Sequence, residues 1–147
     1  MIAPITFFAA GLPKGQPRAR AFAMKGKGVR MYDPGTAEGW KGSIAGSCRE
    51  LIPETPIDEP LTLTLTFYMP RPKSHYHTGK RSSERRNSAP YWYASKPDAD
   101  NLAKAVMDAM TVLGFWKDDD QIVQLRVKKM YACPGMEGCH IEITESY

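Results

Sequence analysis

The most regular alternation of apolar and polar side chains lies in residues 61–69, which read LTLTLTFYM. Three leucines and Phe67 fall on one side of an extended chain, and three threonines and Tyr68 fall on the other. A period of two over this length predicts a strand that turns one face to a hydrophobic core.

Two other segments carry apolar residues at helical spacing. Between about Asp100 and Leu113 an apolar stripe recurs at steps of three and four residues, and it comprises Leu102, Ala105, Val106, Ala109, Met110 and Leu113. The opposite arc is polar and carries Asn101, Lys104, Asp108 and Thr111. Gly114 is a natural residue to end this helix. A second helix is predicted over about Ala37–Leu51, with Thr36 as its N-cap and with Trp40, Ile44 and Cys48 on its buried face.

Short apolar segments between turn residues predict the remaining strands, which are Ile5–Ala10, Ala21–Met24, Val29–Tyr32, Ile122–Tyr131 and Cys139–Thr144. Residues 33–36, DPGT, are a predicted turn. This order of strands and helices favours an α+β domain in which two main helices pack on one mixed β-sheet. The 147 residues suit a single domain over residues 1–147.

Composition narrows the class of protein. Hydrophobic residues make up 42% of the chain, as in ordinary globular domains, and no apolar run approaches the roughly 20 residues of a membrane span. The first residues lack the basic region that opens a signal peptide, and Pro4 interrupts their short apolar run. Three cysteines without an export signal indicate free thiols. We therefore expect a cytoplasmic protein with no membrane partner.

Cys133, Cys139 and His140 lie close together in the sequence and raise the question of a zinc site. No second Cys/His pair stands at metal-ligand spacing to complete such a site. The pattern favours packing or hairpin roles for these residues.

Positive charge is concentrated in one long segment. The whole chain carries a net charge of +4, whereas residues 71–96 carry seven basic residues against the single acid Glu84. The seven are Arg71, Lys73, Lys80, Arg81, Arg85, Arg86 and Lys96. Aromatic side chains lie among them at Tyr76, Tyr91, Trp92 and Tyr93, and such mixtures suit phosphate contact and base stacking in nucleic acids. The alternative interpretation is a flexible, solvated loop without a ligand.

Acidic residues gather at both ends of the helix predicted over Asp100–Leu113. Asp98 and Asp100 stand one residue apart at its start, where alternate residues of extended chain would project to the same side. A triple aspartate, residues 118–120, follows its end. Because about 14 residues of helix span roughly 21 Å, the two groups meet within one subunit only if the loop after Gly114 folds back, and otherwise only across a partner subunit. Carboxylates are the expected ligands of Mg²⁺ or Mn²⁺, which can polarise a phosphodiester and activate a bound water.

The acids also have plain structural explanations. Asp100 is a candidate N-cap, and Asp98 would add a favourable interaction with the helix dipole, each worth about 0.3–2 kcal/mol. The triple aspartate is a candidate solvated turn, and Lys104 with Asp108 is a candidate i,i+4 pair. Residue chemistry alone leaves the metal site and these structural roles open.

Two motifs carry a resemblance to a known family. Residues 96–110, KPDADNLAKAVMDAM, and residues 114–132, GFWKDDDQIVQLRVKKMYA, resemble the pattern P-D-x-D-N-x-x-K-x-x-x-D-A-L followed by D-D-x-Q-V of the RusA family of Holliday junction resolvases. Residues 13–20, PKGQPRAR, and residues 69–76, MPRPKSHY, resemble the longer, phage-type members of that family. The two main motifs match in order and spacing, and Met110 stands where leucine is usual.

This resemblance implies a homodimeric endonuclease that binds four-way DNA junctions and nicks two opposed strands with Mg²⁺ or Mn²⁺. By position, Asp98, Asp100 and Asp119 match the metal-binding acids, and Lys104 matches the essential lysine of the helix. The implied role of Lys104 is to stabilise charge on the phosphate in the transition state or to position the water. Asn101 and Asp108 match supporting positions.

Candidate DNA contacts are the basic residues of the two flanking segments: Lys14, Arg18, Arg20, Arg71, Lys73, Lys80, Arg81, Arg85, Arg86 and Lys96. The favoured function is a structure-selective, metal-dependent endonuclease that resolves Holliday junctions in DNA recombination and repair. The alternatives are a non-catalytic module that binds branched or single-stranded DNA, and a nuclease for branched replication or packaging intermediates. Substitution of Asp98 or Asp119 by asparagine distinguishes the endonuclease from the binding module. In an endonuclease it would abolish cleavage and leave DNA binding intact.

Overall fold

The computed structural model describes residues 2–16, 20–24, 28–32 and 37–147, and it describes only the backbone of 20–24 and 28–32. Four strands form a mixed sheet in the order β1-β6-β4-β5. They are β1 Ile5–Ala10, β4 Leu61–Met69, β5 Ile122–Tyr131 and β6 Gly138–Glu145. β4 pairs antiparallel with β6 and parallel with β5, and β6 pairs antiparallel with β1.

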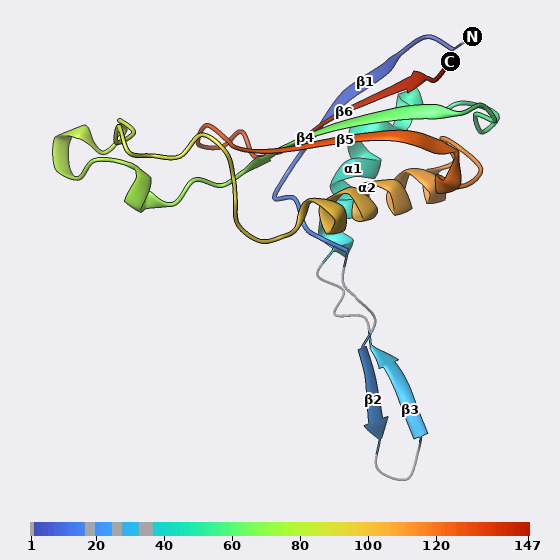
Figure 1. Ribbon diagram of the computed structural model, residues 1–147, viewed down its shortest axis with the longest axis horizontal. Coiled ribbons are helices and arrows are strands. Elements are labelled where there is room, and N and C mark those ends of the chain that lie inside the picture. Colours follow the sequence, from blue (N-terminus) through green and yellow to red (C-terminus); the bar gives the residue numbers. More distant parts are fainter. Residues whose placement is uncertain (1, 17–19, 25–27, 33–36) are drawn as a thin grey trace.

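Two helices lie on the same side of this sheet, as Figure 1 shows. They are α1 Glu38–Cys48, which a short 3₁₀ turn η1 Arg49–Leu51 continues, and α2 Ala99–Leu113. Two further strands, β2 Arg20–Met24 and β3 Gly28–Tyr32, pair with each other as an antiparallel hairpin. The predicted fold class, an α+β domain with two helices on a mixed sheet, is confirmed.

The hydrophobic core lies between the sheet and the helices. The apolar face of β4 is fully buried, and its threonine face is only half-buried. From the helices the core receives Trp40, Ile44 and Cys48 of α1 and Leu102, Ala105, Val106, Ala109 and Met110 of α2. The apolar residues that alternate along β4 and those that recur at helical spacing in α1 and α2 therefore pack against each other in one core. Within the described residues no helix is long and apolar enough to cross a membrane.

Several element boundaries differ from the sequence prediction. α2 begins at Ala99 rather than Asp100, and the N-cap position of α1 is Ala37, whereas Thr36 lies outside the described residues. Val123 and Leu125 lie on the apolar side of the predicted strand, yet they are 59% and 45% exposed. The reason is that β5 is the last strand in the order of the sheet, next to β4, and forms its edge there.

Residues 71–96, which we call the basic arm, leave the end of β4 and return along β5 to the start of α2 (Figure 1). The arm has local structure of its own, with 3₁₀ turns at η2 Lys73–His75 and η3 Gly79–Arg81 and an isolated antiparallel bridge between Tyr76 and Arg85. Its returning limb is fixed to the sheet by a bridge between Trp92 and Met130 and by the bond from the Tyr93 N–H to the Lys129 carbonyl, 3.0 Å. The arm therefore carries turns and a bridge of its own, and its contact with DNA stays a prediction.

Candidate active site

The candidate active site is built on the first turn of α2. Asp98 occupies the N-cap position in extended conformation (φ −66°, ψ 150°), yet its carboxylate makes no capping hydrogen bond. Asp100 lies inside the helix, where one carboxylate oxygen accepts a bond from the N–H of Asn101, 2.9 Å. The N-cap residue is therefore Asp98 and not Asp100, which was one candidate for that role. Both acids are exposed, and the Asp98 carboxylate remains available to a ligand.

The proline-rich segment at residues 13–16 packs directly against this helix start. The Gln16 N–H donates to the Asn101 carbonyl at 2.9 Å. A methyl group added at Gly15 would lie 3.2 Å from Cβ of Asn101 and 3.3 Å from Cβ of Pro97, which is tighter than ordinary contact. The glycine thus lets one segment approach another closely, and the exposed Lys14 directly precedes it in the chain.

Lys129 of β5 holds the chain just before the helix in place. Its ammonium group donates to the carbonyls of Ser95 at 2.7 Å and Pro97 at 2.8 Å. The next residue after Pro97 is Asp98, so these two bonds position the first acid. Sequence analysis missed this role, because it placed Lys129 only within a predicted strand.

The loop after Gly114 turns back against the end of α2, but within the described residues the two acidic groups are not gathered into one cluster. Phe115 and Trp116 are buried in the core, with 0% and 1% of their surface exposed. The Trp116 Nε1–H donates to Thr111 Oγ1 of α2 at 2.8 Å, and the Ile57 N–H donates to the Phe115 carbonyl at 2.9 Å. Because both rings are buried directly after the helix ends, the chain changes direction there and turns toward the core.

A short turn, η4 Asp119–Gln121, then presents the triple aspartate. Asp118 caps it, accepting a bond from the Asp120 N–H at 3.1 Å. The Gln121 carboxamide oxygen accepts from the N–H groups of Lys117 and Asp118, at 2.8 and 3.1 Å. Its nitrogen donates to the carbonyls of Ile57 and Glu59, at 2.8 and 3.2 Å. One glutamine therefore ties the aspartate turn to the segment before β4, and Asp118 has a structural role.

Asp119 interacts electrostatically with charged residues on the polar face of α2. The pKa of Asp119 is raised, chiefly by the hydrogen bond that it shares with Asp118, then by burial and by the charge of Asp118. Asp108 raises it further, whereas the ammonium group of Lys104 lowers it. The pKa of Asp118 is lowered, first by the bond from the Asp120 N–H and then by the bond with Asp119. Carboxyls held this close repel when both are charged, and a bound cation would relieve that repulsion.

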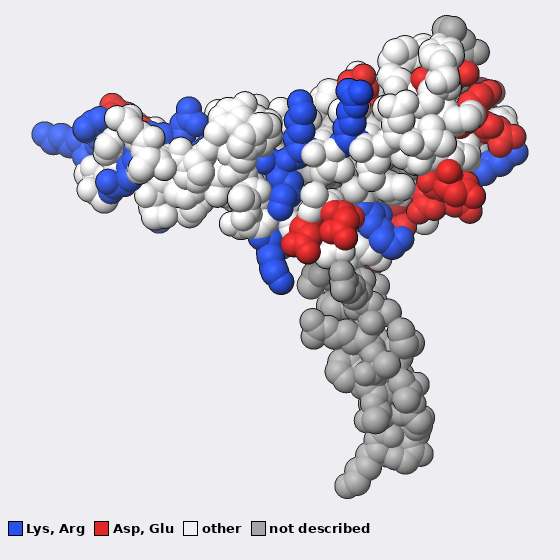
Figure 2. Space-filling view, in the orientation of Figure 1, with Lys and Arg blue, Asp and Glu red and all other residues white. Residues whose placement is uncertain are grey.

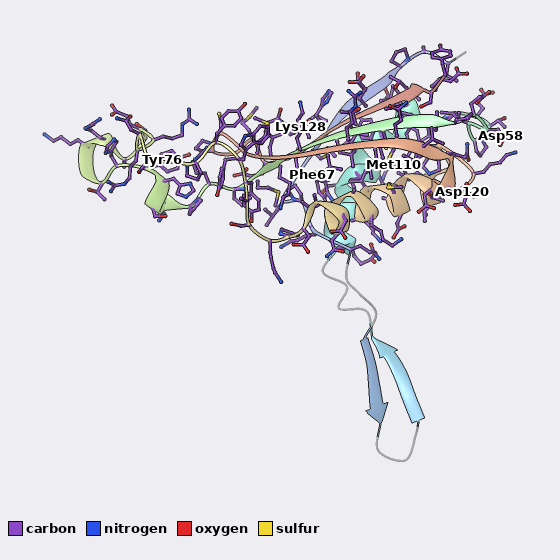
Figure 3. All side chains as sticks on the ribbon, in the orientation of Figure 1. Asp58, Phe67, Tyr76, Met110, Asp120 and Lys128 are labelled. Carbon is purple, nitrogen blue, oxygen red and sulfur yellow. The ribbon has the colours of Figure 1, made fainter. Side chains whose placement is uncertain are left out.

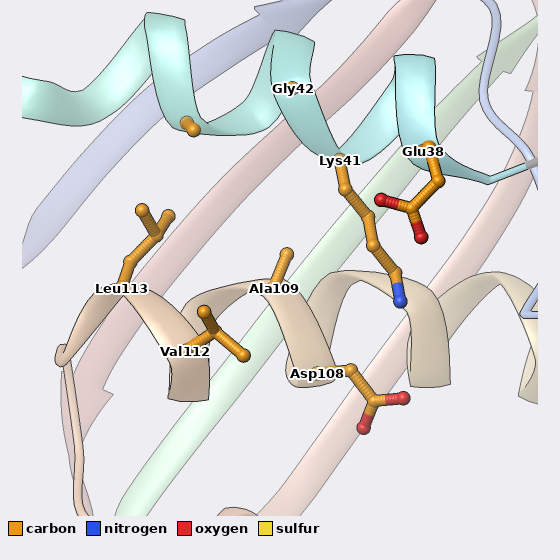
Figure 4. Close-up of a pocket in the computed structure, with 8 residues that line it drawn as sticks. Glu38, Lys41, Gly42, Asp108, Ala109, Val112 and Leu113 are labelled. Carbon is orange, nitrogen blue, oxygen red and sulfur yellow. The ribbon is translucent and has the colours of Figure 1, made fainter. Parts of the chain in front are cut away.

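Lys104 itself is loosely held. Its ammonium nitrogen lies 3.4 Å from Asp108 Oδ1, and 59% of its side chain is exposed. Asp108 also borders a groove of about 390 Å³ between the two helices. Figure 4 shows Lys41 of α1 reaching across this groove toward α2. A surface pair at this distance contributes little to stability, so Lys104 can turn toward a bound phosphate at small cost.

The predicted ligands do not form a ready-made metal site. Among the residues that the structure describes, no three His, Cys, Asp or Glu side chains are close enough to hold an ion. Cys139 is buried, and its burial raises the pKa of the thiol, whereas Cys133 is exposed. The donor chemistry of Asp98, Asp100 and Asp119 suits Mg²⁺ or Mn²⁺, but these carboxylates would have to draw together around the ion.

The predicted DNA contacts fall into two groups in the structure. Arg71, Arg81 and Arg86 serve the arm's own fold: they bond to the Pro90 carbonyl, the Glu84 carboxylate and the Tyr76 carbonyl, at 2.9, 2.8 and 2.9 Å. Other basic side chains of the described chain are exposed and without ion pairs or hydrogen bonds, namely Lys14, Lys73, Lys80, Arg85 and Lys96. Arg18 and the side chain of Arg20 lie outside the described residues.

Figure 2 shows how these charges are distributed over one face of the molecule. Basic side chains gather at the outer end of the arm and along its root, and acidic groups lie over α2 with a basic group between them. Figure 3 places Asp120 at the far end of α2 from the arm. A small α+β domain that sets carboxylates and a lysine beside a basic, aromatic-rich projection has the charge layout of a nuclease.

Comparisons with known proteins agree with this class. The family described as Endodeoxyribonuclease RusA matches residues 10–144 of the chain. An uncharacterized protein, YqaN of Bacillus subtilis (strain 168), is 36% identical over 128 residues, which cover 87% of this chain and 88% of that protein. The crossover junction endodeoxyribonucleases RusA of Escherichia coli (strain K12) and Enterobacteria phage 82 are each 51% identical over 47 residues, which are 32% of this chain and 37% of each relative.

The chain belongs to the RusA family of endodeoxyribonucleases. It is thus a nuclease, an enzyme that hydrolyses phosphodiester bonds of DNA. Enzymes of this family generally depend on a metal ion.

Proposed function

We propose that the protein is a structure-selective, metal-dependent endonuclease that resolves four-way DNA junctions by paired nicks. The observation that carries this proposal is the juxtaposition at α2. Asp98 leaves its carboxylate unused by the helix, Asp119 is held within electrostatic reach of Lys104, and the basic arm ends directly before Asp98. The named activity of the Escherichia coli and phage relatives supports the junction as the substrate.

In this proposal Asp98, Asp100 and Asp119 hold Mg²⁺ or Mn²⁺. The ion supplies Lewis-acid polarisation of the scissile phosphate when bound. Lys104, exposed and weakly paired, turns to the phosphate and stabilises the charge that develops on it. Asp118 and Gln121 keep the aspartate turn in place.

Substrate affinity comes chiefly from the basic residues that have no structural partner, because a side chain free of internal bonds can reach a phosphate without loss. Lys80, Arg85 and Lys96 are the clearest examples. A homodimer would present two identical sites to two opposed strands, in keeping with the approximate two-fold symmetry of a junction.

The test is a nicking assay on a synthetic four-way junction, beside a linear duplex of the same sequence, with Mg²⁺, Mn²⁺ or EDTA. Symmetric, metal-dependent cuts on the junction are expected from the wild type and are expected to be lost in Asp98→Asn and Asp119→Asn. Glu54→Gln is the matched control, because it removes the charge of an exposed acid outside the site. Junction binding without cutting under every ion would instead establish a binding module, and full cutting by the asparagine variants would overturn the assignment of these residues.

A further inference from the structure

A second pocket lies at the root of the basic arm, outside the carboxylate site. It has a volume of about 360 Å³ and is lined by Pro70, Arg71, Pro72, Tyr93, Ser95 and Tyr131. We call it the root pocket. Its size is at the lower end of the roughly 300–1,000 Å³ that is typical of sites for small planar molecules.

Two tyrosine rings line the root pocket, and neighbouring side chains pack against them. The rings of Tyr93 and Tyr131 meet edge to face, with centroids 5.2 Å apart and planes at 67°. The Arg71 guanidinium stacks on Tyr131, 4.3 Å from the ring centroid, while its Nη1 donates to the Pro90 carbonyl at 2.9 Å. His75 also packs on Tyr131, with ring centroids 5.0 Å apart, and its Nδ1 lies 3.3 Å from Arg71 Nη1.

The root pocket and the candidate active site share one short stretch of backbone. Ser95 lines the pocket, and Asp98 follows three residues later, at most about 11 Å along an extended chain. Lys129 fixes this stretch through the Ser95 and Pro97 carbonyls. The pocket is therefore close enough to Asp98 for a nucleotide next to a phosphate bound there to reach it.

We propose that the root pocket binds a nucleobase that has left its helical stack at the branch point of the junction. This inference rests on the proposed function. Every base has a flat face that stacks on a tyrosine ring, so such a pocket is tolerant of sequence. Extraction of a base costs least where pairing and stacking are already disturbed, so the pocket favours branch points over continuous duplex.

A free phosphate is the weaker candidate for the same space. The Arg71 guanidinium already donates to a carbonyl and covers a ring, and the remaining walls are tyrosine rings and prolines. Burial and the neighbouring Tyr131 raise the pKa of Tyr93, so its phenol stays neutral and adds no charge to the pocket. Apart from Arg71, whose guanidinium is already engaged, the pocket is lined by uncharged residues, and its tyrosine rings match a base better than an anion.

The test is a thermodynamic cycle between a change in the pocket and removal of one base from the DNA. Binding is measured by fluorescence anisotropy in EDTA, so that cleavage does not interfere. The junctions are intact or carry a single abasic site at one of the nucleotides that flank the crossover. The variants are Tyr93→Leu, which removes the ring, and Tyr93→Phe, which keeps it.

Tyr93→Leu is expected to weaken binding to the intact junction by about 5- to 150-fold, the range of one base-stacking contact. It is expected to have no effect on the junction that lacks the base in question, and Tyr93→Phe is expected to retain the coupling. Ser95→Met, which partly fills the pocket, should reproduce the pattern, whereas Ser88→Met elsewhere on the arm should not. Unchanged affinity for linear duplex shows that each variant is folded.

Equal losses on the intact junction and on every abasic junction would overturn the root pocket as a base-binding site, as would no loss at all. The two proposals fail separately. If the wild type cuts junctions but the cycle shows no coupling, the function stands and the pocket does not. If the wild type neither cuts nor prefers junctions, the proposed function itself is wrong.

Discussion

Lys129→Met is the change that most directly tests how the fold positions the acids. The side chain keeps its length but loses its charge and all three donors. In the wild type two of those donors bind the Ser95 and Pro97 carbonyls at 2.7 and 2.8 Å. The neighbouring Lys128 provides a matched control, because it is exposed and Figure 3 shows it on the open face of the sheet.

The magnitude follows from the two bonds. Hydrogen bonds from a charged group contribute about 1.5–3 kcal/mol each when shielded from water. Ser95 is exposed and Pro97 is half-buried, so solvent reduces this, and about 1–3 kcal/mol for the pair is a reasonable expectation. The residue after Pro97 is Asp98, and misplacement of a reacting group by about 1 Å costs on the order of 100-fold in rate.

Single-turnover nicking of a four-way junction at saturating enzyme separates these effects from DNA affinity. Lys129→Met should lower the nicking rate by about 10- to 100-fold and lower the urea midpoint. Lys128→Met should leave both unchanged and alter at most the salt dependence of binding, by about one unit of slope. Equal nicking rates and equal urea midpoints for the two variants would refute the idea that Lys129 positions Asp98. Lys129 would then have no larger role than the exposed Lys128.

Two further changes probe the other contacts that build the site. Gln121→Leu leaves four backbone groups without the partner that they have now, so it should destabilise the protein by about 2–4 kcal/mol in urea unfolding and abolish nicking; a variant with normal stability would contradict this. Gly15→Ala should lower nicking because its methyl group would press on Asn101, whereas Gly46→Ala on the open side of α1 should raise stability by about 0.5–1 kcal/mol without changing the rate. Identical rates for the two alanine variants would show that the contact at Gly15 has no role in the site.

The sequence predicts those parts of the fold that one periodic pattern decides. β4 and the apolar stripe of α2 are found as expected, because each buries one regular face against the same core. β5 shows the same alternation but lies at the sheet edge, so Val123 and Leu125 stay exposed. An alternating pattern tells which residues share a face, but it does not tell whether another element covers that face.

The acids were found from their spacing, but their arrangement depends on contacts that the spacing does not contain. The loop after Gly114 folds back because Phe115 and Trp116 are drawn into the core. A signal for Lys129 did exist: it falls two residues after Val127, on the side of β5 that carries apolar residues, where a lysine needs a specific partner. That partner is a pair of carbonyls in a distant segment, and only the folded chain identifies it.

A chain of hydrogen bonds connects the basic arm to the first acid of the site. The arm returns to the body through Tyr93, whose N–H is bound to the Lys129 carbonyl, and the Lys129 ammonium holds Ser95 and Pro97. Asp98 follows directly, so any displacement of the arm root is transmitted to its carboxylate through a few residues of fixed backbone. In the described chain the proposed ligands are not already grouped tightly enough to hold a metal ion. The position of the backbone at residues 95–97 therefore affects how easily the Asp98 carboxylate can approach the other ligands. Substitutions at the arm root should therefore change the cleavage rate as well as the affinity for DNA, whereas substitutions at its outer end, such as Lys80→Met, should change affinity alone.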